Sequence, residues 1–165
     1  MVGDFVKDRG YLTLGSRFKR LGERLQGEVQ ELARAEGFDV PAGLFPAIGA
    51  LDEAGSLTIG ELAEALGISQ PGATRSVEKL AKLGLVKSVR RPADRRIKAV
   101  TLTDACKALV LAARLDLWPR VERGVAEICD GLDGSLLEIL AAIERALDDQ
   151  PLLRRAAKPR SDDDA

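Results

Sequence analysis

The chain has 165 residues, of which 45% are apolar and 31% charged, close to the average of a globular domain. It has no histidine, which excludes Ser-His and Cys-His catalysis and every histidine-ligated metal site. Cys106 and Cys129 are too few for a disulfide framework and lack a metal-ligand spacing. We therefore expect two small apolar side chains packed in helices, and neither a metal nor a cofactor.

Two features of the sequence bear on its cellular location. Charged residues between Asp4 and Arg9 interrupt the start of the chain, which does not resemble a signal peptide. The longest run without a charge covers residues 40–51, which is too short to span a bilayer. We therefore expect a soluble protein of the cytoplasm that does not bind a membrane.

Charge is distributed unevenly along the chain. The formal net charge is −1, which by itself argues against a nucleic-acid-binding protein. Residues 69–98, however, contain nine basic and two acidic residues, a net charge of +7, so the remaining 135 residues sum to −8. Such a local excess is typical of a surface that binds a polyanion, and a merely solvated charged face is the alternative.

A long amphipathic helix is expected first, over residues 11–35. Apolar residues recur along one face at steps of three or four, and so narrow a stripe needs a partner helix from this chain or from a second copy. Gly37 ends the helix, and Pro41 and Pro46 break up the segment that follows. The stripe consists of Leu14, Phe18, Leu21, Leu25, Val29 and Leu32.

A pair of short helices is expected after a helix that starts near Pro46 and ends at Gly55. Thr58 and Glu61 form a capping box for a helix over residues 59–66. Ser69 is an N-cap for a helix that runs to about residue 83. Two short helices joined by a tight turn that contains a glycine are the sequence form of a helix-turn-helix.

A β-hairpin is expected next, with strands over residues 85–91 and 97–103 and the turn-forming residues Pro92, Ala93 and Asp94 between them. Thr103 then caps a helix whose pattern continues past Pro119, where we expect a kink or an interruption.

The last helix is preceded by a turn over residues 130–134. Ser135 and Glu138 form a second capping box at its start. Residues 157–165 are expected to be a disordered acidic tail.

The predicted fold is mainly α-helical with a small β-hairpin. It places a winged helix-turn-helix over residues 42–103, between helices of residues 11–35 and 104–153 that form a dimerisation region. Packing within one chain is the alternative use of the apolar stripes, but one winged helix reads too few bases for useful specificity. The residues expected in the dimer interface are Leu14, Phe18, Leu21, Leu25, Leu136, Leu140, Ile143 and Leu147.

Two stretches in the middle of the chain have a pattern shared with known regulators. Residues 57–86 read LTIGELAEALGISQPGATRSVEKLAKLGLV, a type of stretch that many winged-helix regulators share. Residues 94–103 read DRRIKAVTLT, an Asp-x-Arg followed by a strand that ends in Leu-Thr. This second stretch is more specific and resembles the wing signature of the MarR family of bacterial transcription regulators. The order of the predicted helices is similar to that of the family over about residues 11–153.

The resemblance implies a homodimer with interlocking terminal helices, bound to an inverted-repeat operator in double-stranded DNA. The helix from Ser69 would enter the major groove, and the wing would place Arg96 in the minor groove, with Asp94 holding it. The resemblance also implies release from DNA by a small aromatic or anionic ligand. Many members of the family are repressors and others are activators, and the sequence leaves both roles open. Zinc-sensing members use histidines and peroxide-sensing members use a cysteine near the start of the first helix; this sequence has neither, so it supports neither kind of sensing.

The DNA contacts are expected from the recognition helix and from the wing. Gln70 can form paired hydrogen bonds with adenine and Arg75 with guanine, whereas Ser69 serves mainly as a cap. Gly72 and Ala73 are small, which lets the first helical turn lie close to the bases. The predicted residues are Ser69, Gln70, Gly72, Ala73, Thr74, Arg75 and Lys79 in the recognition helix, and Arg90, Arg91, Asp94, Arg95, Arg96 and Lys98 in the wing.

Phe45 and Trp118 are the candidates for lining a ligand pocket. Both residues fall in the apolar pattern of a predicted helix, where an aromatic side chain belongs to the core more often than to a pocket. Core packing and pocket lining both stay open. Two other function classes also stay open. One is a winged-helix protein-interaction module that no longer binds DNA, against which the wing arginines argue. The other is an enzyme, for which the sequence has no phosphate loop, dinucleotide fingerprint or metal constellation.

Overall fold

The computed structural model describes residues 3–91 and 96–156. It divides the chain into two compact units, one up to Val121 and the other from Glu122 onwards. Within the described residues, no helix combines the length and the apolar character needed to cross a membrane. The acidic tail predicted over residues 157–165 lies outside the described residues.

The first unit begins with a short helix that the sequence pattern did not predict. Helix α1 (Phe5–Asp8) and a 3₁₀ turn (Gly10–Thr13) precede α2 (Leu14–Ala35), so the α-helix starts three residues later than expected.

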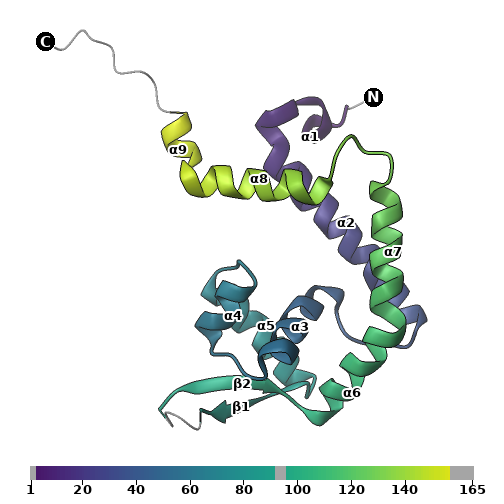
Figure 1. The fold of residues 1–165 in the computed structure, drawn as a ribbon, viewed down its shortest axis with the longest axis vertical. Coiled ribbons are helices and arrows are strands. Elements are labelled where there is room, and N and C mark those ends of the chain that lie inside the picture. Colours follow the sequence, from purple (N-terminus) through teal and green to yellow (C-terminus); the bar gives the residue numbers. More distant parts are fainter. Residues whose placement is uncertain (1–2, 92–95, 157–165) are drawn as a thin grey trace, which may run out of the picture. The chain divides into compact units, whose positions relative to one another are not determined.

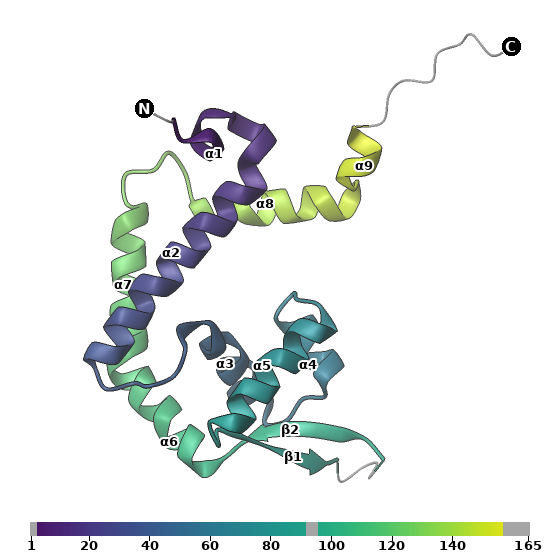
Figure 2. The ribbon, with the colours of Figure 1, turned by 180° about the vertical axis from the view of Figure 1, so that it is seen from behind.

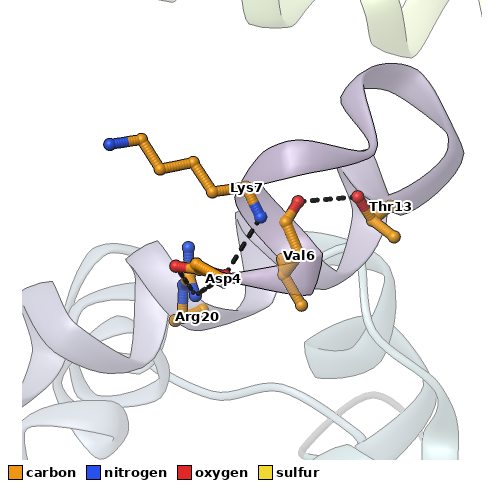
Figure 3. A network of polar contacts seen from close by, with 5 residues as sticks. All are labelled: Asp4, Val6, Lys7, Thr13 and Arg20. Carbon is orange, nitrogen blue, oxygen red and sulfur yellow. Dashed lines mark hydrogen bonds and ion pairs between the residues drawn. The ribbon is translucent and has the colours of Figure 1, made fainter. Parts of the chain in front are cut away.

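Hydrogen bonds hold α1 to the start of α2, as Figure 3 shows. The Asp4 carboxylate accepts the Lys7 N–H at 3.1 Å and pairs with Arg20 of α2 at 2.8 Å. The Thr13 hydroxyl donates to the Val6 carbonyl at 2.7 Å.

The segment between α2 and the next helix is held by a glutamine of α2. The Ala42 N–H donates to Gln30 Oε1 at 2.6 Å, and Gln30 Nε2 donates to the Val40 carbonyl at 3.3 Å. A 3₁₀ turn (Ala42–Leu44) then leads into α3 (Phe45–Ala54), with Pro46 in its first turn as predicted. Buried backbone polar groups need partners, and Gln30 supplies them where no regular element does.

The helix-turn-helix has the predicted elements, α4 (Ile59–Ala65) and α5 (Gln70–Lys82). The capping box at Thr58 and Glu61 is present with both of its hydrogen bonds. Ser69 caps α5 by accepting the Gly72 N–H. Gly67 has a φ of +61°, the left-handed conformation that lets α4 end tightly before α5 begins.

The wing is an antiparallel pair of strands, β1 (Val86–Arg90) and β2 (Lys98–Leu102). The register pairs Val86 with Leu102 and Arg90 with Lys98. Strand β2 packs against α3 and α6 and β1 against α5, which Figures 1 and 2 show from opposite sides. A feature that the sequence pattern did not predict is the bridge between Leu57 and Val100, whose backbone groups exchange hydrogen bonds of 3.0 and 2.7 Å.

The core of this unit lies between α3, α4, α5, the wing and α6 (Asp104–Ala112). Ile48, Leu51, Leu62 and Leu80 are among the fully buried side chains. Cys106 is fully buried with them, and burial, followed by the nearby Asp52 charge, raises the pKa of its thiol. The expectation that Cys106 is a small apolar core residue is therefore confirmed, while Cys129 is half-buried at the end of α7.

The helix that follows the wing is interrupted where the proline predicted an interruption. Helix α6 passes through a π-helical segment (Ala113–Leu117) into α7 (Trp118–Cys129), and Pro119 is the second residue of α7. Proline has no N–H and its ring clashes with the carbonyl four residues earlier. A local change of hydrogen-bond register, such as a π-turn, is one way for a helix to accommodate it.

The second unit contains the end of α7, then α8 (Leu136–Asp149) and α9 (Leu152–Arg155). The Ser135 hydroxyl accepts the Glu138 N–H at 3.3 Å, which is one of the two bonds expected from the second capping box. Pro151, which cannot continue a helix, separates α8 from the single turn of α9.

Candidate nucleic-acid interface

Helix α5 presents a basic ridge to solvent, which we define as Arg75, Lys79 and Lys82. These exposed residues are spaced by four and three positions and therefore lie on one face of the helix. The opposite face is buried, with Ala73 and Leu80 each at 0% exposure. The predicted recognition helix thus has an apolar side in the core and a cationic side available to a partner.

The first turn of α5 is stabilised by side-chain hydrogen bonds. Ser69 is a cap, as expected, because its hydroxyl accepts the Gly72 N–H at 3.3 Å. The Thr74 hydroxyl donates to the Gln70 carbonyl at 3.0 Å. Gln70 is exposed at the helix start, and Gly72 and Thr74 are half-buried.

Ala73 corrects one of the sequence-based predictions. The sequence pattern predicts it among the DNA-contacting residues, but its side chain is 0% exposed and packs in the core with Leu62 and Leu80. The helical period of 3.6 residues turns position 73 inward when position 75 points outward. The structure therefore assigns the Ala73 side chain to packing.

The wing carries exposed basic residues on both strands. Arg90 at the end of β1 and Lys98 at the start of β2 are register partners, and both are exposed, as is Arg96. Asp94 and Arg95, which were also predicted to act at the wing, lie outside the described residues.

Arg91, directly after β1, is half-buried. Its Nη2 donates to Glu61 Oε2 of α4 at 2.5 Å, and the two side chains are 31% and 40% exposed. The pKa of Glu61 lies below its ordinary value, first because of the Thr58 N–H bond and then because of Arg91. The sequence pattern identified Glu61 only as a capping residue, since no local signal links positions 61 and 91.

A pocket of about 230 Å³ lies within the first unit. Phe45 and Trp118 both line this pocket, and both also pack against the buried core. The two residues thus take part in core packing and in pocket lining at the same time. Of the described residues that line the pocket, Gln26 alone is polar. The complete lining is Leu25, Gln26, Val29, Ala42, Phe45, Pro46, Leu117, Trp118 and Val121.

The apolar stripes predicted for a dimer interface are exposed or half-buried in the single chain. On α2, Phe18, Leu21 and Leu25 are 40%, 48% and 37% exposed, and Leu14 is half-buried. On α8, considered separately, Leu136 and Leu147 are 36% and 50% exposed. The other two predicted interface residues, both on α8 and both half-buried, are Leu140 and Ile143.

The fold and sequence are similar to those of known regulators. A family model described as MarR family matches residues 38–97. The HTH-type transcriptional regulator YcgE of Bacillus subtilis (strain 168) is 30% identical over 127 residues, which cover 74% of this chain and 76% of YcgE.

Solved structures agree in fold. A cysteine-to-serine mutant of MarR from E. coli, complexed with operator DNA, has a TM-score of 0.64 at 20% identity and covers 89% of this chain and 98% of that one. BpsR of Bordetella bronchiseptica has a TM-score of 0.63 at 23% identity, and the match covers 90% of this chain and 99% of BpsR. Together with the family model and the curated relative, these findings show that the chain belongs to the MarR family of transcriptional regulators.

Proposed function

We propose that the protein is a dimeric, sequence-specific DNA-binding repressor that a small-molecule ligand releases, acting in the cytoplasm. The observation that carries this proposal is the basic ridge of α5, formed by Arg75, Lys79 and Lys82, with the basic wing in the same unit. The major groove of B-DNA admits an α-helix, and cationic side chains on its exposed face neutralise phosphates. The related MarR structure is a complex with operator DNA.

The side chains of α5 differ in the chemistry that they offer to a duplex. Arg75 has a planar guanidinium suited to paired bonds with guanine, and Gln70 has an amide suited to adenine. Lys79 is a point charge on a flexible stem and suits a phosphate. We assign Arg90, Arg96 and Lys98 to the wing contacts, with Arg96 in the minor groove, where negative potential favours arginine.

Dimerisation is supported by the exposed apolar stripes. Phe18, Leu21 and Leu25 on α2 are large hydrophobic residues that lie along one helical face. Contiguous exposed apolar surface of this kind is typical of an interaction site. We propose that residues 11–35 and 104–153 dimerise, so that the winged helices of residues 42–103 read the two halves of an inverted repeat.

The ligand site that we propose is the pocket lined by Phe45 and Trp118. Its lining offers two aromatic rings, aliphatic groups and the amide of Gln26, which suits a small aromatic molecule better than an anion. For the related BpsR, DNA binding is regulated by 6-hydroxynicotinic acid. Leu25 belongs both to this lining and to the predicted dimer stripe, so an occupant would touch the dimerisation region.

A fluorescence anisotropy titration with a labelled random-sequence duplex tests the DNA-binding proposal. We expect the protein to bind the duplex at low salt and much more weakly at moderate salt. For each phosphate contact, the logarithm of the affinity should fall by about 0.9 per unit of log salt concentration. A protein-interaction module that has lost DNA binding would give no anisotropy change at either salt concentration, and that result would overturn the proposal.

A further inference from the structure

The wing is joined to helix α4 by an ion pair that spans 30 residues of sequence. Arg91 Nη2 donates to Glu61 Oε2 at 2.5 Å. Arg91 comes directly after β1, and its N–H donates to the Ile97 carbonyl at 3.2 Å, which continues the hairpin by one more bond. The pair therefore ties the far part of the described hairpin to the helix that precedes α5.

The acceptor of this pair is already held in place. The Thr58 N–H donates to the same oxygen, Glu61 Oε2, at 2.8 Å, and the Glu61 N–H donates to the Thr58 hydroxyl at 3.2 Å. A carboxylate fixed in this way loses little further conformational freedom when an arginine binds it. The capping box thus gives Arg91 a rigid anchor on the helix-turn-helix.

The strand geometry separates Arg91 from its neighbour Arg90. Successive side chains of a strand point to opposite faces, so these two arginines diverge. Arg91 is half-buried against Glu61, whereas Arg90 is exposed. If Arg91 contacted a phosphate, its pair with Glu61 would break. The Glu61 carboxylate would then lie near the DNA without its cation.

We propose that Arg91 is a positioning residue, which sets the wing relative to α4 and α5 by pairing with Glu61 and does not itself contact DNA. This inference rests on the proposed DNA-binding function of the wing. It revises the prediction that Arg91 belongs to the DNA-contacting set.

The test compares Glu61→Gln, Arg91→Gln and the double variant in the full chain. Glutamine at position 61 keeps the side-chain acceptor of the capping box, so Glu61→Gln removes the charge while leaving the cap. Lys98→Gln, on the exposed start of β2, is the control for a direct phosphate contact. Binding to a labelled random-sequence duplex is measured over a range of salt concentrations, and amide exchange of the wing is measured by NMR without DNA.

We expect both single variants to weaken DNA binding by about twofold to fivefold, the scale of a partly exposed ion pair, with an unchanged salt slope. The double variant should be no weaker than either single variant, because both changes break one pair. Lys98→Gln should instead lower the salt slope by about 0.9 per protomer. The backbone amide of residue 91 should exchange faster in the Glu61→Gln and Arg91→Gln variants and at the wild-type rate in Lys98→Gln.

The proposal would be overturned by two results together. In the first, Arg91→Gln lowers the salt slope as Lys98→Gln does; in the second, Glu61→Gln binds DNA with wild-type affinity. These results would show that Arg91 contacts phosphate. Unchanged exchange of the backbone amide of residue 91 in both Glu61→Gln and Arg91→Gln would also overturn the proposal. The exchange measurement needs no DNA, so it distinguishes a failure of this inference from a failure of the DNA-binding function itself.

Discussion

Thr58 and Glu61 cap each other at the start of α4. The Thr58 N–H donates to Glu61 Oε2 at 2.8 Å, and the Glu61 N–H donates to Thr58 Oγ1 at 3.2 Å. The bond from Thr58, followed by the Arg91 pair, holds the pKa of Glu61 below its ordinary value of 4.5. The ionised form of Glu61 is therefore favoured in the folded protein, which links folding stability to pH.

Glu61→Gln should change the pH dependence of stability. A carboxyl whose pKa is lowered on folding stabilises the protein above its unfolded pKa, and this contribution disappears as the pH falls through the folded-state pKa. We expect the variant to have a lower Tm than the wild type at pH 7, and the difference to shrink as the pH falls below about 4.5. Thermal unfolding followed by circular dichroism between pH 7 and pH 3 measures this. A Tm difference that does not vary with pH would mean that the charge of Glu61 is not responsible.

Gly72→Ala should separate folding from DNA binding. A Cβ at this position would lie 3.4 Å from Ser69 Oγ and 3.6 Å from Ile68 Cδ1, which are ordinary contacts. Alanine also favours a helix over glycine by about 1 kcal/mol. We expect an unchanged or raised Tm together with weaker binding to duplex DNA, because the added methyl group obstructs the close approach of the first helical turn. Wild-type DNA affinity in this variant would show that the first turn does not approach the bases.

Arg75→Ala and Lys79→Ala should differ in their effect on specificity. Arg75→Ala should cost about 1–3 kcal/mol per half-site on the operator and relax the preference at one base position. Lys79→Ala should weaken binding to all DNA sequences alike and lower the salt slope of binding by about 0.9 per protomer. Anisotropy titrations with operator and random duplexes over a range of salt concentrations measure both effects. An equal loss on the two duplexes for Arg75→Ala would assign this side chain to a phosphate.

The oligomeric state tests the apolar stripe of α2. Sedimentation at micromolar concentration should give about 35 kDa, twice the chain mass of 17.7 kDa. Leu21→Glu places a charge on the stripe and should yield monomers, because an unpaired charge in an apolar interface is costly. Lys19→Glu adds the same residue to the same helix outside the stripe and should leave the dimer intact. A wild-type monomer under these conditions would exclude binding as a dimer to two half-sites.

Trp118 is the one tryptophan of the chain, so its fluorescence reports directly on the pocket. We expect phenol to quench it and to weaken DNA binding, since the lining offers aromatic surface and an amide. Val29→Phe fills the pocket and should abolish the quenching. The control Leu111→Phe, at an exposed position outside the lining, should not. Equal quenching in Val29→Phe and in the control would place the ligand elsewhere.

Most helices and both strands follow from local signals in the sequence. The Thr58 and Glu61 capping box, the Ser69 cap, the glycine turn at Gly67 and the interruption near Pro119 all lie where the pattern predicted them. Such signals depend on residues three or four positions apart, whose geometry is set by the backbone of one turn. Chain order, periodicity and local charge were therefore enough to predict the winged helix-turn-helix and the basic excess of residues 69–98.

Contacts between residues far apart in the sequence depend on the tertiary structure. The sequence could not pair Arg91 with Glu61, bridge Leu57 to Val100 or bring Gln30 to the backbone of Ala42. It placed the Ala73 side chain at the DNA surface, although the side chain lies in the core. Each of these features depends on the direction in which a side chain leaves its element once α4, α5 and the wing have packed together. That direction is set by the burial of the shared core, a property of the whole unit that no window of a few residues contains.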